Sequence, residues 1–437
     1  MGQDKWLGGT LGADGNIYGI PGSAEFVLKI DTSSGCATTI GPRLRGKLKW
    51  LRGILTEDGA IIGIPSNANS VLRIDPQTGD VSSFGGGLDG RWKWHGAVLA
   101  GDGNIYCIPC NAEQVLKIRP KTREVELIGP FFKGRQKWYG GLLGRDGKVY
   151  GIPNNADSVI RIDPQTSLVD MIGKVPLGGW KWHGGAEGPD GALYGVPSHA
   201  DRVLRIDPLA GSVELLGDPI PEGKYRPGGR YKYGGAVVGS DGCLYCLPSD
   251  ADRVLRVDTQ SKQVTEVGPS FLQAHNKWQN GFLGSDDKIY AIPLNAPGVL
   301  CIDCKRGPGT RQKDGPRQSD SEALDGVSLL ELPEIPAELT LLASTPSTGE
   351  GGDPHETMKG QAVGGLERGG EAFAKSREKW EGGVEGPDGC LYCMPMRAKT
   401  VLKICPCRNP HDAVASPATL LLTGEQEKES HRETRQV

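Results

Sequence analysis

A single pattern recurs eight times along this chain of 437 residues and limits the folds that it can adopt. Each copy begins with a lysine followed by an aromatic residue. These pairs start at residues 5, 49, 93, 137, 181, 232, 277 and 379, and tyrosine replaces tryptophan in the sixth copy. The first four intervals are 44 residues long, and the later ones are 51, 45 and 102 residues. A residue type that recurs in every copy of a repeat usually serves the fold.

Each copy contains four short runs with β-strand character, separated by turns. The runs follow the patterns W-x-G-G, I-Y-x-I-P, V-L-x-I-D and V-x-x-I-G, and an Asp-Gly pair that suits a tight hairpin with positive φ separates the first two. No copy has helical periodicity. Four strands in about 44 residues are typical of a β-propeller blade, with the glycine-rich run as the innermost strand. We therefore predict an all-β fold, a closed propeller of eight four-stranded blades. Seven blades plus an appended unit is the alternative.

Two regions interrupt this rhythm. We expect blades one to seven within residues 1–303 and blade eight within 379–424, with the segment ATLLLTG as its last strand. Residues 304–378 and 425–437 combine low hydrophobicity with many Gly, Ser, Pro and charged residues, a composition that predicts a disordered insertion and a disordered tail. The insertion contains the apolar segment 326–343. Either its first part is the outer strand of blade seven, or the segment is a short partner-binding segment.

The overall charge of the chain says little about its function. The chain has 50 basic and 53 acidic residues, a balance that by itself does not indicate nucleic acid. It shows no secretory signal and no apolar run of transmembrane length. We therefore expect a cytoplasmic monomer without a membrane or nucleic-acid partner.

The cysteines need the repeat alignment to be interpreted. Four C-x-x-C pairs lie at 107–110, 243–246, 301–304 and 390–393. Such spacing ordinarily suggests zinc or redox chemistry. However, Cys107, Cys246 and Cys393 occupy a position that glycine or alanine holds in the other copies. We therefore predict buried cysteines that act as small residues, with metal and redox roles as the alternatives. Cys405 and Cys407 flank a proline, face the same side of the chain and are exempt from this prediction.

Residues 183–207, HGGAEGPDGALYGVPSHADRVLRID, carry a resemblance. The Gly-Gly strand, the G-P-D-G-x-L hairpin and the following strand with its Arg-Ile core resemble the streptogramin lyase (virginiamycin B lyase-like) group of β-propellers, which is related in pattern to NHL-type propellers. The resemblance implies a propeller fold. For the lyases it also implies catalysis by a histidine on the innermost strand and a glutamate at the end of the next strand, with Mg²⁺. His95 and His183 match the histidine position. The glutamate position is proline in all eight copies, at Pro21, Pro65, Pro109, Pro153, Pro197, Pro248, Pro293 and Pro395.

The position directly after each Lys-aromatic pair differs between copies. It lies on the predicted innermost strand, where side chains can face the central channel. The residues are Leu7, Leu51, His95, Tyr139, His183, Gly234, Gln279 and Glu381. A mixed polar ring of this kind could bind a small ligand or an ion, with His95, His183 and Glu381 as its titratable members. A water-filled channel is the alternative.

The other candidate surface lies on one face of the ring. Six linkers between blades carry a net charge of +13 on a chain of −3, and about +7 remains without the recurrent lysines. Aromatic residues are interleaved with these charges, and such a surface attracts acidic or phosphorylated partners. Propeller topology places the loop between the second and third strands on the same face, although its Asn, Ser and Asp residues also suit tight turns. Scattered solvated charge is the alternative for the linkers.

From these observations we predict a non-catalytic binding scaffold for an acidic or phosphorylated protein or a small anionic ligand, with no cofactor. The residues that we expect to contact the partner are Arg43, Arg45, Lys47, Lys133, Arg135, Lys224, Arg226 and Arg230 in the linkers and His199, Asp250 and Arg397 in the loops. One alternative is a Mg²⁺-assisted lyase or lactonase-like enzyme that acts on a small cyclic ester through His95, His183 and Glu381. Another is a purely structural repeat that interacts through the insertion.

Overall fold

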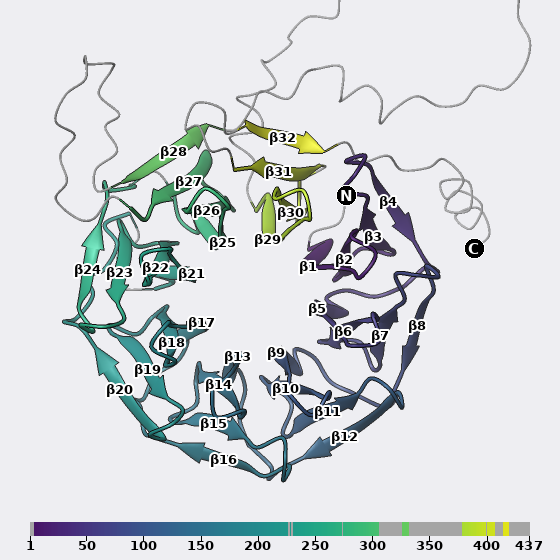
Figure 1. Cartoon of the computed structure of the whole chain (residues 1–437). Helices are drawn as coiled ribbons and strands as arrows, with labels where there is room; N and C mark the ends of the chain where they lie inside the picture. The colour runs from purple at the N-terminus through teal and green to yellow at the C-terminus, as the bar shows by residue number, and fades with distance from the viewer. Residues whose placement is uncertain are drawn as a thin grey trace, which may run out of the picture.

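The repeats form eight four-stranded antiparallel sheets arranged in a closed ring around a channel (Figure 1), as the sequence predicts. The computed structural model describes residues 4–225, 228, 230–272, 274–305, 326–331, 378–398, 400–406 and 414–418, and of 330–331 and 414–418 only the backbone. No helix among these residues is long and apolar enough to cross a membrane.

Every blade uses its four strands in chain order from the channel outward. The innermost strands are β1 (Trp6–Leu11), β5 (Trp50–Leu55), β9 (Trp94–Leu99), β13 (Trp138–Leu143), β17 (Trp182–Glu187), β21 (Tyr233–Val238), β25 (Trp278–Leu283) and β29 (Trp380–Glu385). The second strands are β2 (Ile17–Pro21), β6 (Ile61–Pro65), β10 (Ile105–Pro109), β14 (Val149–Pro153), β18 (Leu193–Pro197), β22 (Cys243–Pro248), β26 (Lys288–Pro293) and β30 (Leu391–Pro395). The third strands are β3 (Val27–Ile30), β7 (Val71–Ile74), β11 (Val115–Arg119), β15 (Val159–Ile162), β19 (Val203–Asp207), β23 (Val254–Asp258), β27 (Gly298–Asp303) and β31 (Val401–Cys405). The outermost strands are β4 (Ala37–Ile40), β8 (Val81–Phe84), β12 (Glu124–Ile128), β16 (Val169–Ile172), β20 (Ser212–Leu216), β24 (Val264–Val267), β28 (Val327–Glu331) and β32 (Val414–Ala418).

The recurrent Lys-Trp pair bonds both within its own blade and to the blade before it. The Trp50 indole donates to the carbonyl of Ser70, 20 residues later, and the same bond recurs in the other tryptophan copies. The buried Lys49 ammonium donates to the carbonyls of Gly22 and Ala24 in the preceding blade. The tryptophan therefore satisfies a carbonyl within its own blade, and the lysine satisfies carbonyls at the junction with the preceding blade, which explains why the pair recurs. In the sixth copy, the buried Tyr233 hydroxyl has no hydrogen-bond partner among the described residues.

The ring closes through the same contact that joins its inner blades. β29 of blade eight lies beside β1 of blade one (Figure 1), and Lys5 Nζ donates to the carbonyl of Ala398 at 2.6 Å. Lys379 makes the equivalent bond to Ala296, between blades seven and eight. The first and last blades are therefore held together without exchanging a strand.

The segments at the two interruptions pair as outer strands. Within the apolar segment 326–343, Val327–Glu331 forms β28 and pairs with β27, so the first of our two alternatives holds there. The last strand of blade eight is Val414–Ala418 and not the predicted segment 418–424. An outermost strand is hydrogen-bonded to one neighbouring strand only, so the apolar run 418–424 did not determine where the strand lies. For the same reason the strand tolerates Pro417. The predicted disordered insertion and tail fall largely on residues 306–325, 332–377 and 419–437, which lie outside the described residues.

Candidate functional site

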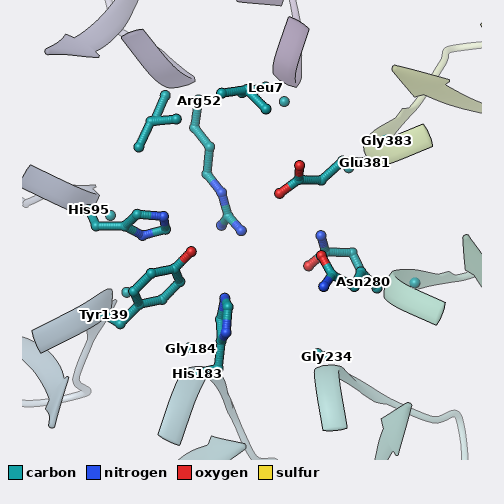
Figure 2. A pocket seen from close by; sticks show the side chains of 18 of the residues that line it. Leu7, Arg52, His95, Tyr139, His183, Gly184, Gly234, Asn280, Glu381 and Gly383 are labelled. Carbon is teal, nitrogen blue, oxygen red and sulfur yellow. The ribbon is translucent and has the colours of Figure 1, made fainter. Parts of the chain in front are cut away.

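Residues at the position after the Lys-aromatic pair come together around one cavity, as predicted. Its volume is ≈ 310 Å³, and all eight inner strands contribute to its lining. Figure 2 shows His95, Tyr139, His183 and Glu381 pointing into the central space from four different blades. Blade six contributes only Gly234, Gly235 and Ala236.

A second ring of positions, one residue further along each inner strand, also lines the cavity. Five of its residues are glycines with positive φ, and Gly235 is a sixth glycine without it. A Cβ on Gly96 would lie 2.6 Å from the Cα of Gly140, so glycine is required where inner strands converge.

Arg52 and Asn280 occupy this position in blades two and seven, and both have positive φ, at 57° and 59°. Figure 2 shows the Arg52 side chain extending across the cavity toward His183 and Tyr139. Sequence reasoning missed Arg52. The signal was available, because the second copy replaces glycine with arginine at a position where the other copies have glycine or asparagine.

Aromatic rings form one wall of the cavity. His95 and Tyr139 stack with their ring centroids 3.4 Å apart, and the His183 ring meets Tyr139 edge-on at 3.9 Å. Trp92, in the linker, continues the stack beyond His95 at 6.4 Å. The stack therefore extends from blade five to the linker that precedes blade three.

Burial and one positive charge control the titration of this cluster. Burial lowers the pKa of His183 to about 4, and the nearby Arg52 guanidinium adds to this effect. Burial also lowers the pKa of His95 well below its usual value, again with a contribution from Arg52. Both imidazoles are therefore neutral at pH 7. Burial raises the pKa of Glu381, which Arg52 partly offsets.

The cavity does not fit the Mg²⁺ that the lyase resemblance implies. Mg²⁺ prefers several oxygen ligands, usually carboxylates. Glu381 is the single carboxylate among the lining residues, and the glutamate position of the lyases remains proline. Across the described residues, no group of three or more His, Cys, Asp or Glu side chains is arranged to hold a metal ion. We therefore derive no metal-dependent step.

On the linker face, defined as the face that carries the linkers and the loops between second and third strands, the loop residues have structural partners. The Asn67 amide donates to the carbonyl of Lys47 in one linker, and its oxygen accepts the N–H of Trp92 in the next. Asn111, Asn155 and Asn295 repeat this pair of bonds. We call this pair of bonds the asparagine clamp. The residue whose N–H bonds to the asparagine oxygen has positive φ although it is not glycine, and at Trp92 φ is 52°. The clamp therefore stabilises an uncommon backbone conformation.

The three loop residues proposed as partner contacts are also engaged within the propeller. Asp250 accepts the N–H of Asn276 at 2.6 Å, as the asparagines do in other blades. Arg397 forms an ion pair with Glu378, and the His199 ring packs edge-on against Tyr231. The role of this loop in forming tight turns therefore explains why Asp250 occupies this position.

The linker cations lie on the surface, as predicted. Arg45, Lys47, Lys133, Arg135, Lys224 and Arg230 are exposed. Arg43 forms an exposed ion pair with Glu25 at 2.9 Å. Arg226 lies outside the described residues.

A groove of ≈ 950 Å³ runs between the linkers that enter blades two and three. Arg45 and Lys47 line it from one side and Arg91 and Trp92 from the other. No Asp or Glu is among its lining residues.

The cysteines in the glycine-equivalent position are fully buried, as predicted for Cys107, Cys246 and Cys393. Burial raises the pKa of the Cys246 thiol to about 12, which suppresses thiolate chemistry. The prediction is wrong for Cys390, which forms a disulfide with Cys405 on the neighbouring strand. Antiparallel pairing places the two residues opposite each other, with Cα atoms 4.3 Å apart, a relation that sequence spacing does not reveal. Cys407 lies outside the described residues.

Neither a protein-family model nor a curated protein sequence matches the chain. Solved structures do resemble its fold. A streptogramin B lyase and the virginiamycin B lyase of Staphylococcus aureus each match with a TM-score of 0.51 and 18% sequence identity, over 67% of this chain and 92% of theirs. The protein is thus an eight-bladed β-propeller that resembles the streptogramin lyases in fold. At this identity the likeness concerns the fold alone and carries no activity with it.

Proposed function

We propose that the propeller is a non-catalytic scaffold that binds an acidic or phosphorylated protein segment on its linker face. The observation that carries the proposal is the groove between the linkers that enter blades two and three. Three exposed cations, Arg45, Lys47 and Arg91, line this groove without a single carboxylate. Guanidinium and ammonium groups placed in this way favour carboxylate and phosphate ligands.

Trp92 adds an apolar contact to this charged surface. Its side chain is 38% exposed at the groove, while the Asn67 clamp fixes its backbone. Aromatic and arginine side chains together are typical of the residues that dominate protein interfaces. The groove therefore offers both charge complementarity and an anchoring ring.

The test is a triple charge reversal, Arg45→Glu, Lys47→Glu and Arg91→Glu, measured by fluorescence anisotropy with a phosphoserine peptide and a glutamate-rich peptide. We expect loss of binding in the variant, and for the wild type a Kd that rises with salt, because exposed charges are screened within about 10 Å at 0.1 M.

The matched control reverses three exposed cations on the opposite face, Lys121, Arg123 and Lys262. It changes the net charge equally, so it should bind like the wild type if the groove is the site. Equal losses in both variants would mean that only net charge matters, and the proposal would fail.

A catalytic alternative is favoured by the convergence of His95, His183 and Glu381 on one cavity. In this alternative, a neutral histidine would act as general base on a small cyclic ester. Turnover of a lactone by the wild type that is lost in His95→Ala and His183→Ala would replace the scaffold proposal.

A further inference from the structure

We propose that the channel cavity binds a small zwitterion of the α-amino acid class, with its carboxylate on Arg52 and its ammonium group on Glu381. This site shares no lining residue with the linker-face groove, and the proposal does not rest on the proposed function. The cavity volume of ≈ 310 Å³ is at the lower end of the ~300–1,000 Å³ that is usual for small-molecule sites.

The backbone at Arg52 is the first observation. Arginine has no conformational reason to occupy a left-handed position where most copies use glycine, and a side chain there costs roughly 1–2 kcal/mol. Strained residues of this kind cluster at ligand sites. Here the strain places an exposed guanidinium in the middle of the channel (Figure 2), without an ion pair among those found in the described residues.

The charge of the cavity is the second observation. Arg52 is the one Lys or Arg and Glu381 the one Asp or Glu among the lining residues, and the pKa of both histidines is lowered. A simple anion would pair with Arg52 but would leave the carboxyl group of Glu381 without a partner, and a simple cation would leave the guanidinium of Arg52 without one. A ligand that carries both a carboxylate and an ammonium group offers a partner to each residue.

The polar groups around these charges are the third observation. The Nδ1 atom of His95 is buried and has no hydrogen-bond partner outside its own residue in the described part of the chain. Asn280 approaches from the opposite side of the cavity (Figure 2). A buried polar atom without a partner is costly, and a ligand group can supply that partner.

The shape of the lining leaves room for the ligand. Blade six presents only small residues, and Figure 2 shows no side chain entering the cavity at Gly234 or Gly184. A Cβ built on Gly184 would meet nothing within 4 Å. The free space therefore lies at Gly184, beside the aromatic wall that His183 and Tyr139 form.

The test measures binding of the twenty L-α-amino acids to the full chain by saturation-transfer NMR and calorimetry. We expect at least one to bind, and the matching carboxylic acid without its amino group and amine without its carboxylate to bind more weakly. Arg52→Gly should weaken binding about ten- to hundredfold, the range for loss of a charged hydrogen-bonding partner. Glu381→Gln should reduce the preference for the amino acid over its deaminated analogue.

Arg52→Gly also separates a binding role from a structural one. It introduces the residue that most other blades carry, so thermal unfolding should show equal or higher stability while binding is lost. Arg123→Gly is the matched control, because Arg123 also has positive φ, at 58°, but lies on the outer β11–β12 turn. It should leave binding unchanged.

Three results would overturn the proposal: no amino acid binds the wild type, Arg52→Gly binds as the wild type does, or the carboxylic acid alone binds as tightly as the amino acid. The last result would define a simple anion site. None of these outcomes affects the linker-face proposal, whose variants and probes are different.

Discussion

Two rings of residues lie next to each other on the inner strands, and they have opposite character. The Lys-Trp ring is nearly invariant across eight blades and largely buried; its tryptophans bond to carbonyls within their own blade and its lysines to carbonyls of the preceding blade. The ring directly after it varies from leucine to histidine to glutamate and faces the cavity. The comparison shows that a residue type is repeated where the position has the same neighbours in every blade. Residue types differ between blades where the positions face one common cavity.

The largest expected effect comes from breaking the invariant ring. Trp182→Ala removes a ring that is 1% exposed and bonded to the carbonyl of Arg202, so the free energy of unfolding should fall by about 3–5 kcal/mol. His183→Ala, one residue later, should change it by less than half as much. Urea unfolding followed by circular dichroism measures both. Similar losses for the two variants would show that the rings do not differ in the way we describe.

A smaller effect is expected from the lysine of the same ring. Lys277→Met keeps the buried stem but leaves the carbonyls of Ala251 and Ala274 without the ammonium donor, at a cost of about 1–3 kcal/mol. Lys262→Met, on the exposed outer surface, is the control and should cost less than about 0.5 kcal/mol. Chemical denaturation of the three proteins under the same conditions provides the comparison. Loss of stability in the control alone would contradict the assignment of Lys277.

The variable ring should make the stability of the protein depend on pH. His183 has a pKa of about 4 in the folded protein and about 6.5 when unfolded, so between these values the unfolded state binds more protons. Stability should therefore decrease as pH falls from 6.5 to 4, with a slope of up to about 1.4 kcal/mol per pH unit for this group. His183→Gln should reduce the slope by that amount in unfolding curves collected across this range.

Arg52 links this titration to the cavity. Arg52→Gly removes a positive charge beside the imidazole, so the pKa of His183 should rise toward its usual value. NMR titration of the imidazole resonance measures the shift directly. A pKa that does not move would mean that burial alone sets it.

The smallest effect on stability is expected at a position where the residue type differs between blades but only a small side chain is required. Cys107 is fully buried, but its position accepts glycine or alanine in other blades. Cys107→Ala should cost less than about 1.5 kcal/mol, because it removes one heavy atom from a position that already suits small residues. Zinc bound stoichiometrically by the wild type and lost together with folding in this variant would show that the position has a function.

The amino-acid sequence by itself determined the repeating framework. Its period determined the number of blades, the Asp-Gly pairs indicated the hairpins, and the variation after each Lys-aromatic pair identified one of the two rings of residues that line the cavity. These features follow from local neighbours that recur in every copy, so aligning the copies is enough to find them.

The tertiary structure decided what depends on ring closure and strand register. Arg52 joins His183 in one cavity because closure brings together strands from distant blades, and the Asn67 clamp becomes visible only when consecutive linkers lie on one face. The Cys390–Cys405 disulfide and the position of β32 depend on antiparallel register. The sequence gives the identity of each residue along the chain. Strand pairing and ring closure decide which residues come into contact, because both depend on contacts between segments far apart in the chain.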